Sequence, residues 1–462
     1  MKSLDLLATE ENVYLAFEAD AIGRNEDVAA FVSMLNSLDR ESVIAVNARW
    51  GEGKTFFIKQ VKMILDSFNQ NYKKTERKEE IYKVWRQLTR GKEIEVQPFV
   101  TVYYDAWEND NDEDPVLSLI VSILQEIDGL EDLGVDRSLL STAGELLDFF
   151  TGRTVKGVLE GLKGKNPLEC IRKGKDFDAK VTSFLKAVLP ERGNRLVIFV
   201  DELDRCKPDY AIRLLERVKH YFANENITFV FSVNIDELQH TICKFYGSSF
   251  DACRYLDRFF DFRVELPKPD MEKYNYSIGL GRGGWLYESV CKEVIEMFHM
   301  GLREIAKFYR IAKTVAYKPT HRESGGFDAS FSDGKGRQVC FYCIVPLMIG
   351  LSMSDRLRYN NFIRGEDSGP LKELFKDSNE FSSLLSLLLN EGETYSEEGI
   401  SQTRVCVRRE DKLEEVYNAV FVKKYDRYSY ETGIGKVSFT GNIKDEVLRI
   451  VSGLSKYADY QI

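Results

Sequence analysis

Short hydrophobic runs alternate with amphipathic stretches along the first 270 residues of the chain. Five runs rich in β-branched and aromatic residues are expected to be strands, at residues 42–47, 98–104, 195–201, 226–233 and 260–267. The stretches between them carry hydrophobic residues at helical spacing. The run at 195–201 is hydrophobic almost throughout, as expected of a strand covered on both faces. Strands separated by helices predict an α/β fold with a parallel sheet flanked by helices.

The spacing of these runs also indicates how the chain is divided. About ninety residues separate the second and third predicted strands, more than one crossover helix needs, so a helical insertion is expected at about residues 110–192. After Pro269 the pattern becomes mainly helical. Residues 318–337 are rich in Gly, Ser, Asp and Lys and are predicted to form an exposed loop.

The composition bounds the class of protein. The chain has 462 residues, of which 44% are hydrophobic and 30% charged, enough to bury a large core. The formal net charge of −10 argues against a broad positive surface for nucleic acid. Eight cysteines are too sparse for a disulfide scaffold, and residues 1–11 lack the pattern of a secretory signal. We therefore expect a soluble, cytoplasmic protein.

One apolar stretch and one cysteine pair require interpretation. The stretch 339–353 is shorter than the roughly twenty residues that cross a membrane, and is expected to be a buried helix. Cys340 and Cys343 lie within it, without a second ligand pair or a thioredoxin-like context. Two core residues are therefore a better interpretation than a zinc or redox site.

The segment Ala48-Arg-Trp-Gly-Glu-Gly-Lys-Thr55 follows the first strand and opens a helix. Gly51 and Gly53 allow a tight turn whose backbone N–H groups approach phosphate oxygens, and the helix N-terminus adds its positive dipole end. Lys54 is expected to reach the β- and γ-phosphates, and the Thr55 hydroxyl to bind Mg²⁺. Glycine is usual at position 48, but a methyl group fits there if φ is negative. The alternative to a phosphate loop is an ordinary strand–turn–helix junction.

Acidic side chains end the third predicted strand, at Asp201 and Glu202. Ligands of open parallel sheets bind at the carboxyl ends of the strands. There Asp201 can hold Mg²⁺ through water, and Glu202 can accept a proton from an attacking water. Asn234 follows the fourth strand, where it either hydrogen-bonds that water or caps the next helix.

Six segments in this order resemble the KAP family of P-loop NTPases, a branch of the ASCE and AAA+-like ATPases. They are residues 20–24, 49–55, 104–108 with 114–115, 201–208, 255–262 and 301–305. The most specific is Asp201-Glu-Leu-Asp-Arg-Cys-Lys-Pro208, a Walker B strand end extended by Leu-Asp-Arg-Cys and a proline. Many members carry inserted transmembrane segments, whereas the insertion here is polar and amphipathic, so the chain resembles the soluble bacterial branch.

The resemblance implies ATP and Mg²⁺ as cofactors. It also implies an ATPase core over residues 1–270, a helical lid over 271–317 and a C-terminal region over 318–462. The residues that it places at the nucleotide are Ile22, Gly23, Arg24, Arg49, Trp50, Gly51, Glu52, Gly53, Lys54, Thr55 and Phe56.

Arginines complete the site that the resemblance implies. Arg303 in the lid would sense the γ-phosphate, and Arg254 or Arg258 would act as an arginine finger across a subunit boundary. The alternative for these arginines is a surface salt bridge. Asp204 and Arg205 are expected to order the strand end, and Trp107 to anchor the core.

Two other stretches combine aromatic and basic residues. Residues 71–92 carry more Lys and Arg than Glu, together with Tyr72, Tyr82 and Trp85. A solvated helix with inward-facing aromatics is favoured there over a nucleic-acid contact. Residues 417–430 are interpreted as a partner surface or a strand.

These observations favour an ATP-hydrolysing conformational or assembly switch, expected to be a homo-oligomer with an effector partner. The alternatives are a nucleotide-gated oligomeric scaffold with slow hydrolysis, or an ATPase that handles nucleic acid. The resemblance to soluble bacterial members implies a role in anti-phage defence.

Overall fold

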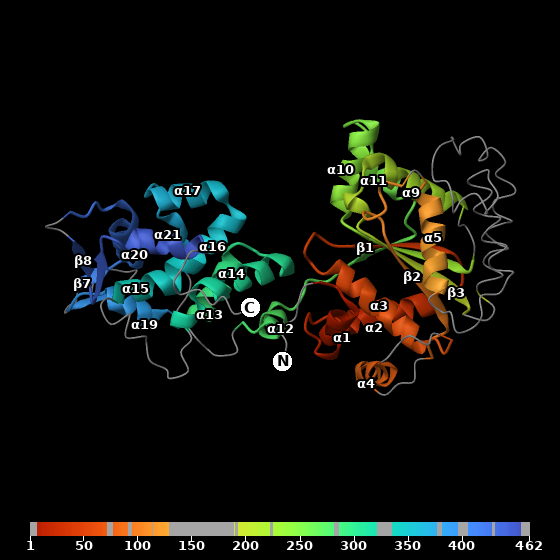
Figure 1. Ribbon diagram of the computed structural model, residues 1–462, viewed down its shortest axis with the longest axis horizontal. Helices are drawn as coiled ribbons and strands as arrows, with labels where there is room; N and C mark the ends of the chain where they lie inside the picture. Colours follow the sequence, from red (N-terminus) through yellow and green to blue (C-terminus); the bar gives the residue numbers. More distant parts are fainter. Residues whose placement is uncertain are drawn as a thin grey trace. The chain divides into compact units, whose positions relative to one another are not determined.

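The computed structural model describes residues 7–71, 77–90, 95–112, 114–128, 189, 193–221, 225–280, 286–320, 335–376, 381–395, 405–426 and 430–453. The chain divides into two compact units, Met1–Tyr274 and Asn275–Ile462. The first contains the large sheet and the second is mainly helical (Figure 1). Of the expected insertion at 110–192, helix α5 (Pro115–Asp128) is described, while most of the rest lies outside the described residues.

The first unit is built on a five-stranded sheet. Its strands are β1 (Ser42–Asn47), β2 (Phe99–Asp105), β3 (Arg195–Asp201), β4 (Ile227–Val233) and β5 (Phe262–Glu265). Their order is β2-β3-β4-β1-β5, and every neighbouring pair is parallel. The predicted parallel α/β sheet is confirmed. The register pairs Asp105 with Asp201, and Asn47 with Glu265. Polar residues therefore line up at the carboxyl ends of the strands.

Helices cover both faces of this sheet (Figure 1). On one face lie α1 (Glu10–Glu18), α2 (Asn25–Asn36), α3 (Lys54–Phe68) and α4 (Lys78–Leu88). On the other lie α5, α9 (Pro208–Tyr221), α10 (Ile235–Tyr246) and α11 (Ala252–Leu256). A short 3₁₀ turn, η3 (Leu203–Arg205), follows β3.

The strands bury side chains on alternate faces, which creates two hydrophobic cores. In β1, Ile44 and Val46 pack against α2 and α3, while Ala45 faces the core under α9 and α10. This alternation is the two-residue period of a strand. The phosphate-loop helix α3 and the acidic end of β3 are therefore fixed by one rigid sheet.

The second unit contains short helices and two small sheets. Its helices are α13 (Leu286–Met297), α14 (Leu302–Thr320), α15 (Lys335–Val339), α16 (Val345–Ser354), α17 (Arg356–Arg364), α18 (Gly369–Leu374), α19 (Ser382–Leu385), η6 (Ser386–Leu388), α20 (Arg409–Tyr417) and α21 (Ile443–Val451), with π-helical turns η5 (Cys340–Ile344) and η7 (Asn418–Val422). Its strand pairs are β6 (Glu393–Tyr395) with β7 (Val405–Val407) and β8 (Glu431–Ile434) with β9 (Val437–Thr440). Helix α12 (Met271–Ile278) spans the division between the units.

The apolar stretch of the second unit is the center of its core. Residues 339–351 are all buried, Cys340 and Cys343 included, so the expected buried helix and core cysteines are confirmed. Gly350 lets α16 approach α13 closely, because a Cβ there would lie 2.5 Å from a methyl carbon of Val294.

One helix in the described part of the chain is long and apolar enough to cross a membrane. It is Gly336–Ser354, with a mean hydropathy of 1.3, and 78% of its apolar window is buried inside the protein. Buried core helices of soluble proteins have the same length and composition, so this is weak evidence for a membrane span.

Two sequence expectations in the second unit require correction. Residues 417–422 are helical rather than a strand, and Tyr417 and Phe421 pack against Phe362 in the core instead of forming a surface. The expected loop at 318–337 is wrong at both ends, because α14 continues to Thr320 and α15 begins at Lys335; residues 321–334 lie outside the described part.

Candidate functional site

The loop between β1 and α3 has the backbone of a phosphate-binding turn. Gly51 and Gly53 have φ values of +82° and +86°, which L side chains rarely adopt. The φ of Ala48 is not positive, so the backbone accommodates its methyl group as expected. Its N–H donates to Val233 O at 3.3 Å, which ties the loop to β4.

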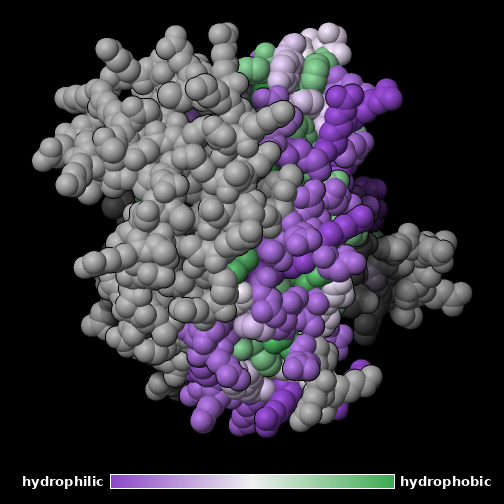
Figure 2. Space-filling model, turned by 90° about the vertical axis from the view of Figure 1, so that its right-hand side faces the viewer, coloured by the Kyte–Doolittle hydropathy of each residue, from purple (hydrophilic) through white to green (hydrophobic). Residues whose placement is uncertain are grey.

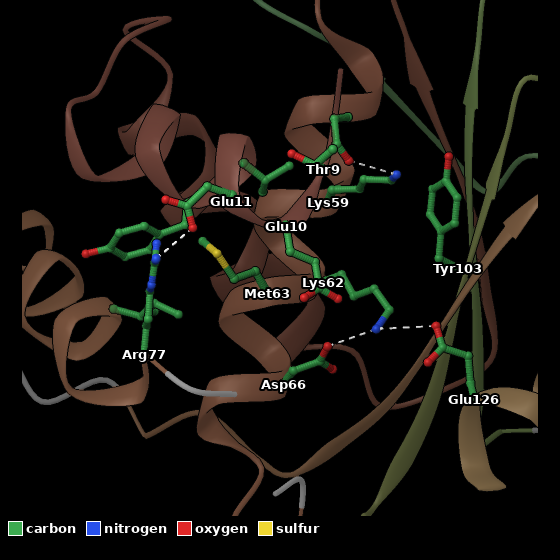
Figure 3. A pocket seen from close by; sticks show the side chains of 14 residues that line it. Thr9, Glu10, Glu11, Lys59, Lys62, Met63, Asp66, Arg77, Tyr103 and Glu126 are labelled. Carbon is green, nitrogen blue, oxygen red and sulfur yellow. Dashed lines mark hydrogen bonds and ion pairs between the residues drawn. The ribbon is translucent and has the colours of Figure 1, made fainter. Parts of the chain in front are cut away.

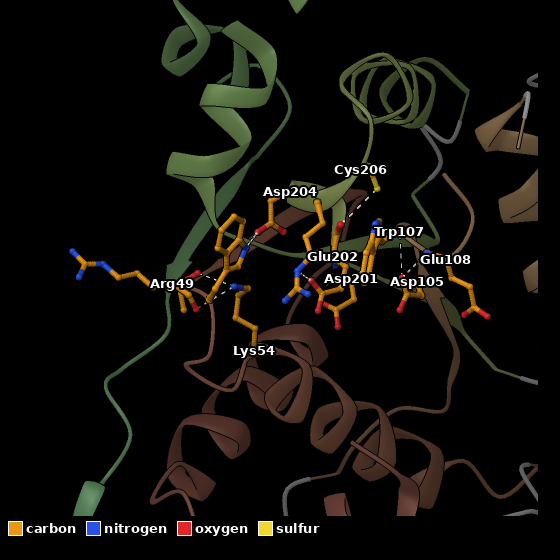
Figure 4. A network of polar contacts seen from close by, with 12 residues as sticks. Arg49, Lys54, Asp105, Trp107, Glu108, Asp201, Glu202, Asp204 and Cys206 are labelled. Carbon is orange, nitrogen blue, oxygen red and sulfur yellow. Dashed lines mark hydrogen bonds and ion pairs between the residues drawn. The ribbon is translucent and has the colours of Figure 1, made fainter. Parts of the chain in front are cut away.

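Lys54 begins α3 directly after this turn and is 8% exposed. Its Nζ donates to Ala48 O at 2.8 Å and to Arg49 O at 3.3 Å. Burial lowers the pKa of Lys54, and the nearby carboxylates of Asp204 and Asp201 oppose that shift. The ammonium is thus held inside the loop by backbone carbonyls, close to acidic groups on β3 (Figure 4).

Asp201 and Glu202 end β3 in different environments. Asp201 is 1% exposed and accepts hydrogen bonds from the Glu202 N–H and from Tyr103 Oη, both at 3.0 Å. Glu202 has a φ of +59°, which is unfavourable for a residue with a side chain. Burial, followed by the charge of Asp201, raises the pKa of Glu202 to about 7. A carboxyl group with such a pKa suits general base catalysis near neutral pH.

Arg205 covers this carboxylate. Its guanidinium forms an ion pair with Glu202 and lies 5.9 Å from the ring centroid of Trp50 and 5.6 Å from that of Trp107. Trp107 is 53% exposed, so the expectation that it anchors the core is wrong. The turn after β2 holds it outward, because Asp105 Oδ1 accepts hydrogen bonds from the Trp107 and Glu108 N–H groups (Figure 4).

Asp204 connects the acidic strand end to the phosphate loop. Trp50 Nε1 donates to Asp204 Oδ2 at 2.5 Å. The carboxylate is 4% exposed, and burial raises the pKa of Asp204. Asp204 and Arg205 therefore do order the strand end, by contacts that also hold Trp50.

Arg24 forms hydrogen bonds that hold the phosphate loop in place. Its guanidinium donates to Glu52 O in the loop and to Pro267 O beyond β5, and the residue is 3% exposed. Gly23 precedes it with a φ of +72°, where a Cβ would lie 2.4 Å from Asp270 Cβ. Arg24 thus stabilises the loop, and Gly23 allows close packing against Asp270, in addition to the nucleotide contact predicted for both residues.

The other predicted nucleotide-binding residues differ in exposure. Ile22 and Phe56 are each 6% exposed, and Thr55 is half-buried at the start of α3. Arg49 is exposed and points away from the carboxylates (Figure 4). Contact of these residues with a nucleotide stays a prediction.

Asn234 and the predicted arginines are placed as follows. Asn234 Oδ1 accepts the Glu237 N–H at 3.4 Å, so in this structure the residue caps α10, as the alternative interpretation expected. Arg254 and Arg258 are exposed, and within the described residues their guanidinium groups form no ion pair. Arg303 is exposed on α14, in the second unit. Its role as a sensor, like the arginine finger, stays a prediction.

The oxygen ligands at the carboxyl ends of these strands fit a nucleotide bound with Mg²⁺. The Thr55 hydroxyl and the carboxylates of Asp201 and Glu202 are the oxygen ligands that Mg²⁺ prefers, directly or through water. Asp204 Oδ1 is buried without a hydrogen-bond partner among the described residues. Lys54 has two backbone acceptors for three N–H donors in this part of the chain. Among the described residues, the loop is therefore flanked by a hydrogen-bond acceptor on Asp204 and an N–H donor on Lys54 that have no protein partner.

The basic stretch at residues 71–92, which includes α4, packs two of its aromatic side chains inward. Trp85 is 3% exposed, and Phe68 contacts the rings of both Tyr82 and Trp85 edge to face. Tyr82 Oη donates to Ser67 O at 2.7 Å. The inward-facing aromatics favoured from the sequence are confirmed for these two residues, while Tyr72 lies outside the described residues.

Figure 2 shows the face of the molecule that lies on the right-hand side of Figure 1. Hydrophilic residues cover most of its described surface, and hydrophobic ones appear in small separate areas. This polar character agrees with the high charged fraction of the sequence, 30%.

Sequence reasoning missed Tyr103 and the Arg205–Glu202 pair. The register of β2 against β3 places Tyr103 on the same face as Asp201, but that pairing is not visible in the sequence. For Arg205, the spacing of three residues from Glu202 within the Walker B extension was the available signal.

Comparison with known proteins tests the identity of the site. A search of curated proteins found no match. The KAP family P-loop domain matches residues 24–278, more than half of the 462 residues. The matched segment contains the whole parallel sheet, the phosphate loop and the acidic end of β3. With this loop, these carboxylates and this match, the chain belongs to the KAP family of P-loop NTPases.

Proposed function

We propose that this chain binds ATP with Mg²⁺, hydrolyses it, and uses the cycle as a conformational or assembly switch. The observation that carries the proposal is the approach of three groups at one sheet edge. These are the buried Lys54 ammonium, the Asp201 carboxylate and the Glu202 carboxyl group, whose pKa is raised to about 7. Bound Mg²⁺ would supply charge neutralisation on the phosphates.

Each residue of the site would have a separate role in binding or hydrolysis. Lys54 would exchange its backbone acceptors for phosphate oxygens, which keeps its charge in the loop. Glu202 would take a proton from the attacking water after its ion pair with Arg205 has opened. Thr55 and Asp201 would hold the metal ion and its water ligands.

Two substitutions test hydrolysis. Glu202→Gln should lower turnover by roughly a hundredfold or more, the range of a lost general base, while ATP stays bound. Lys54→Ala should instead weaken ATP binding. The matched control is Lys62→Ala, on the same helix, because Lys62 pairs with Asp66 and Glu126 away from the loop. Normal turnover in either site variant would refute the proposal.

The Arg205–Glu202 ion pair favours a second function, a nucleotide-gated scaffold with slow hydrolysis. The cation of Arg205 weakens Glu202 as a base, so proton transfer is slowed until that contact opens. Assembly would then depend on ATP binding alone. Light scattering with ATP and with a non-hydrolysable analogue separates the two functions: equal assembly with both supports the scaffold, and a need for turnover supports the switch.

The cellular role that we propose rests on the family alone. Soluble bacterial members suggest a cytoplasmic component of anti-phage defence, acting as an oligomer with an effector partner. Expression of the chain with its genomic neighbours should reduce phage plaques, and Lys54→Ala should remove that reduction. Equal plaque counts for both chains would argue against this role.

A further inference from the structure

Tyr103 approaches the acidic end of β3 from the neighbouring strand. Its phenol oxygen donates a hydrogen bond to Asp201 Oδ2 at 3.0 Å. The other carboxylate oxygen, Oδ1, accepts the Glu202 N–H at the same distance. Each oxygen of the buried Asp201 is thus held by one donor, which fixes the plane of the carboxylate. The second lone pair of each oxygen stays available for a further partner.

The ring of Tyr103 is itself held in place. Lys59 Nζ lies 4.4 Å from the ring centroid and donates to Ala8 O at 3.1 Å. Lys59 belongs to α3, the helix that begins with the phosphate loop, and Ala8 precedes α1. A phenol hydroxyl carries its proton at neutral pH, so Tyr103 serves as the donor in the hydrogen bond to Asp201.

Tyr103 also lines a cavity of about 870 Å³ (Figure 3). The cavity is lined by residues of α1, α3 and α4 together with Tyr103 of β2 and Glu126 of α5, and several of its charged side chains form ion pairs. Lys62 pairs with Asp66 and Glu126, and Arg77 with Glu11. Among the lining residues of the described chain, Tyr103 is the one that hydrogen-bonds to Asp201.

We propose that Tyr103 is a positioning residue for the magnesium site. Its hydroxyl orients the Asp201 carboxylate so that the free lone pairs face the hydration shell of the metal ion. Partners of metal ligands act in this way in many sites, since they fix the orientation of the ligand. This inference rests on the proposed function, because it assumes that a magnesium nucleotide binds at this edge.

The first test measures ATP binding as Mg²⁺ is added, in the full chain carrying Glu202→Gln to prevent turnover. Tyr103→Phe should raise the Mg²⁺ concentration for half-saturation by roughly tenfold, the lower end of the effect of such partners. ATP affinity in EDTA should stay unchanged. The matched control is Tyr82→Phe, which also removes the hydroxyl of a half-buried tyrosine, one that donates to Ser67 O. It should leave both values unchanged.

A double-mutant cycle separates positioning from a general effect on the fold. In an Asp201→Asn background, Tyr103→Phe should cause little further loss, because the group through which it acts is already altered. Equal losses in both backgrounds would overturn the proposal. So would an unchanged Mg²⁺ response in Tyr103→Phe, or an equal loss of ATP affinity in EDTA.

Two further outcomes keep the test decisive. If Tyr103→Phe lowers the thermal midpoint of unfolding strongly, Lys59→Met serves in its place, because it leaves the hydroxyl and removes the cation beside the ring. It should shift the Mg²⁺ response in the same direction by less, and no shift overturns the proposal. If the parent chain binds no ATP, the proposed function fails as well. A normal parent with an unaffected Tyr103→Phe variant refutes the role of Tyr103 alone.

Discussion

Glu202 is held in an unusual state by its immediate neighbours. Its backbone lies in the left-handed region, which costs about 1–3 kcal/mol for such residues. Its carboxyl group is buried beside Asp201, which raises its pKa to about 7, while the cation of Arg205 acts in the opposite direction. The surrounding structure must therefore hold Glu202 in place, as is common at functional sites.

The raised pKa predicts the pH dependence of hydrolysis. A general base works only when ionised, so kcat/KM should fall as the pH drops below about 7. Arg205→Met removes a charge that lowers this pKa, and the acidic limb should then move to higher pH. The measurement is kcat/KM for ATP between pH 5.5 and 9, at saturating Mg²⁺.

Arg86→Met serves as the control, since Arg86 is exposed on α4 and is not one of the predicted site residues. The acidic limb of its pH profile should coincide with that of the unmodified chain. An acidic limb that stays in place in Arg205→Met would mean that another group than Glu202 is titrating.

The phosphate loop is joined to its neighbouring elements by Arg24. This residue lies at the start of α2 and donates to backbone carbonyls of the loop and of the segment after β5. Burial lowers the pKa of Arg24 to about 10, so the side chain stays charged at neutral pH. Three elements that are distant in sequence therefore share one buried guanidinium.

Arg24→Met should lower the free energy of unfolding by about 2 kcal/mol, even without nucleotide. The reason is that two backbone carbonyls lose the charged donor that the buried Arg24 guanidinium supplies. Urea unfolding of the free protein measures this loss. Arg49→Met, an exposed arginine of the same loop, should leave the stability within about 0.5 kcal/mol.

The opposite pattern would be informative. Unchanged stability in Arg24→Met, together with weaker ATP binding, would show that Arg24 serves the nucleotide and not the loop. Arg24→Lys provides a further comparison, because a single ammonium cannot reproduce the forked geometry of the guanidinium.

A switch requires that the two compact units respond to one event. The phosphate loop and the acidic strand end belong to Met1–Tyr274, and the predicted sensor Arg303 belongs to Asn275–Ile462. If ATP binds only to the first unit, the second has no reason to change. Coupling therefore depends on a residue such as Arg303, which would contact the γ-phosphate in the ATP-bound chain.

Hydrogen exchange tests this coupling. In the Glu202→Gln chain, ATP with Mg²⁺ should slow amide exchange at the start of α14 by roughly tenfold, a coupling of about 1.4 kcal/mol. Arg303→Ala should remove the effect on α14 and keep the protection of the phosphate loop. Arg310→Ala, which alters an exposed arginine on the same helix, should behave like the parent.

Protection that is confined to the first unit in every variant would contradict the switch. That result would favour the scaffold, provided that ATP still promotes assembly.

Much of the fold followed from local pattern. The strands at 42–47 and 195–201 were predicted with the bounds that the structure shows, because hydrophobic runs bounded by turns require little tertiary information. The phosphate loop was predicted for the same reason: its glycines, lysine and threonine are neighbours in the chain, and their geometry is local. The match to the KAP family P-loop domain confirms the family that these segments indicated.

Contacts between distant residues were decided by the tertiary structure. Tyr103 and Asp201 are 98 positions apart, and Trp50 and Asp204 are 154 apart, yet each pair shares a hydrogen bond. Trp107 was expected in the core but lies exposed beside Arg205, because the turn after β2 directs it outward. The sequence by itself determined which groups could perform the chemistry. Sheet register and helix packing decided which of them meet, since these depend on the burial of side chains from the whole domain at once.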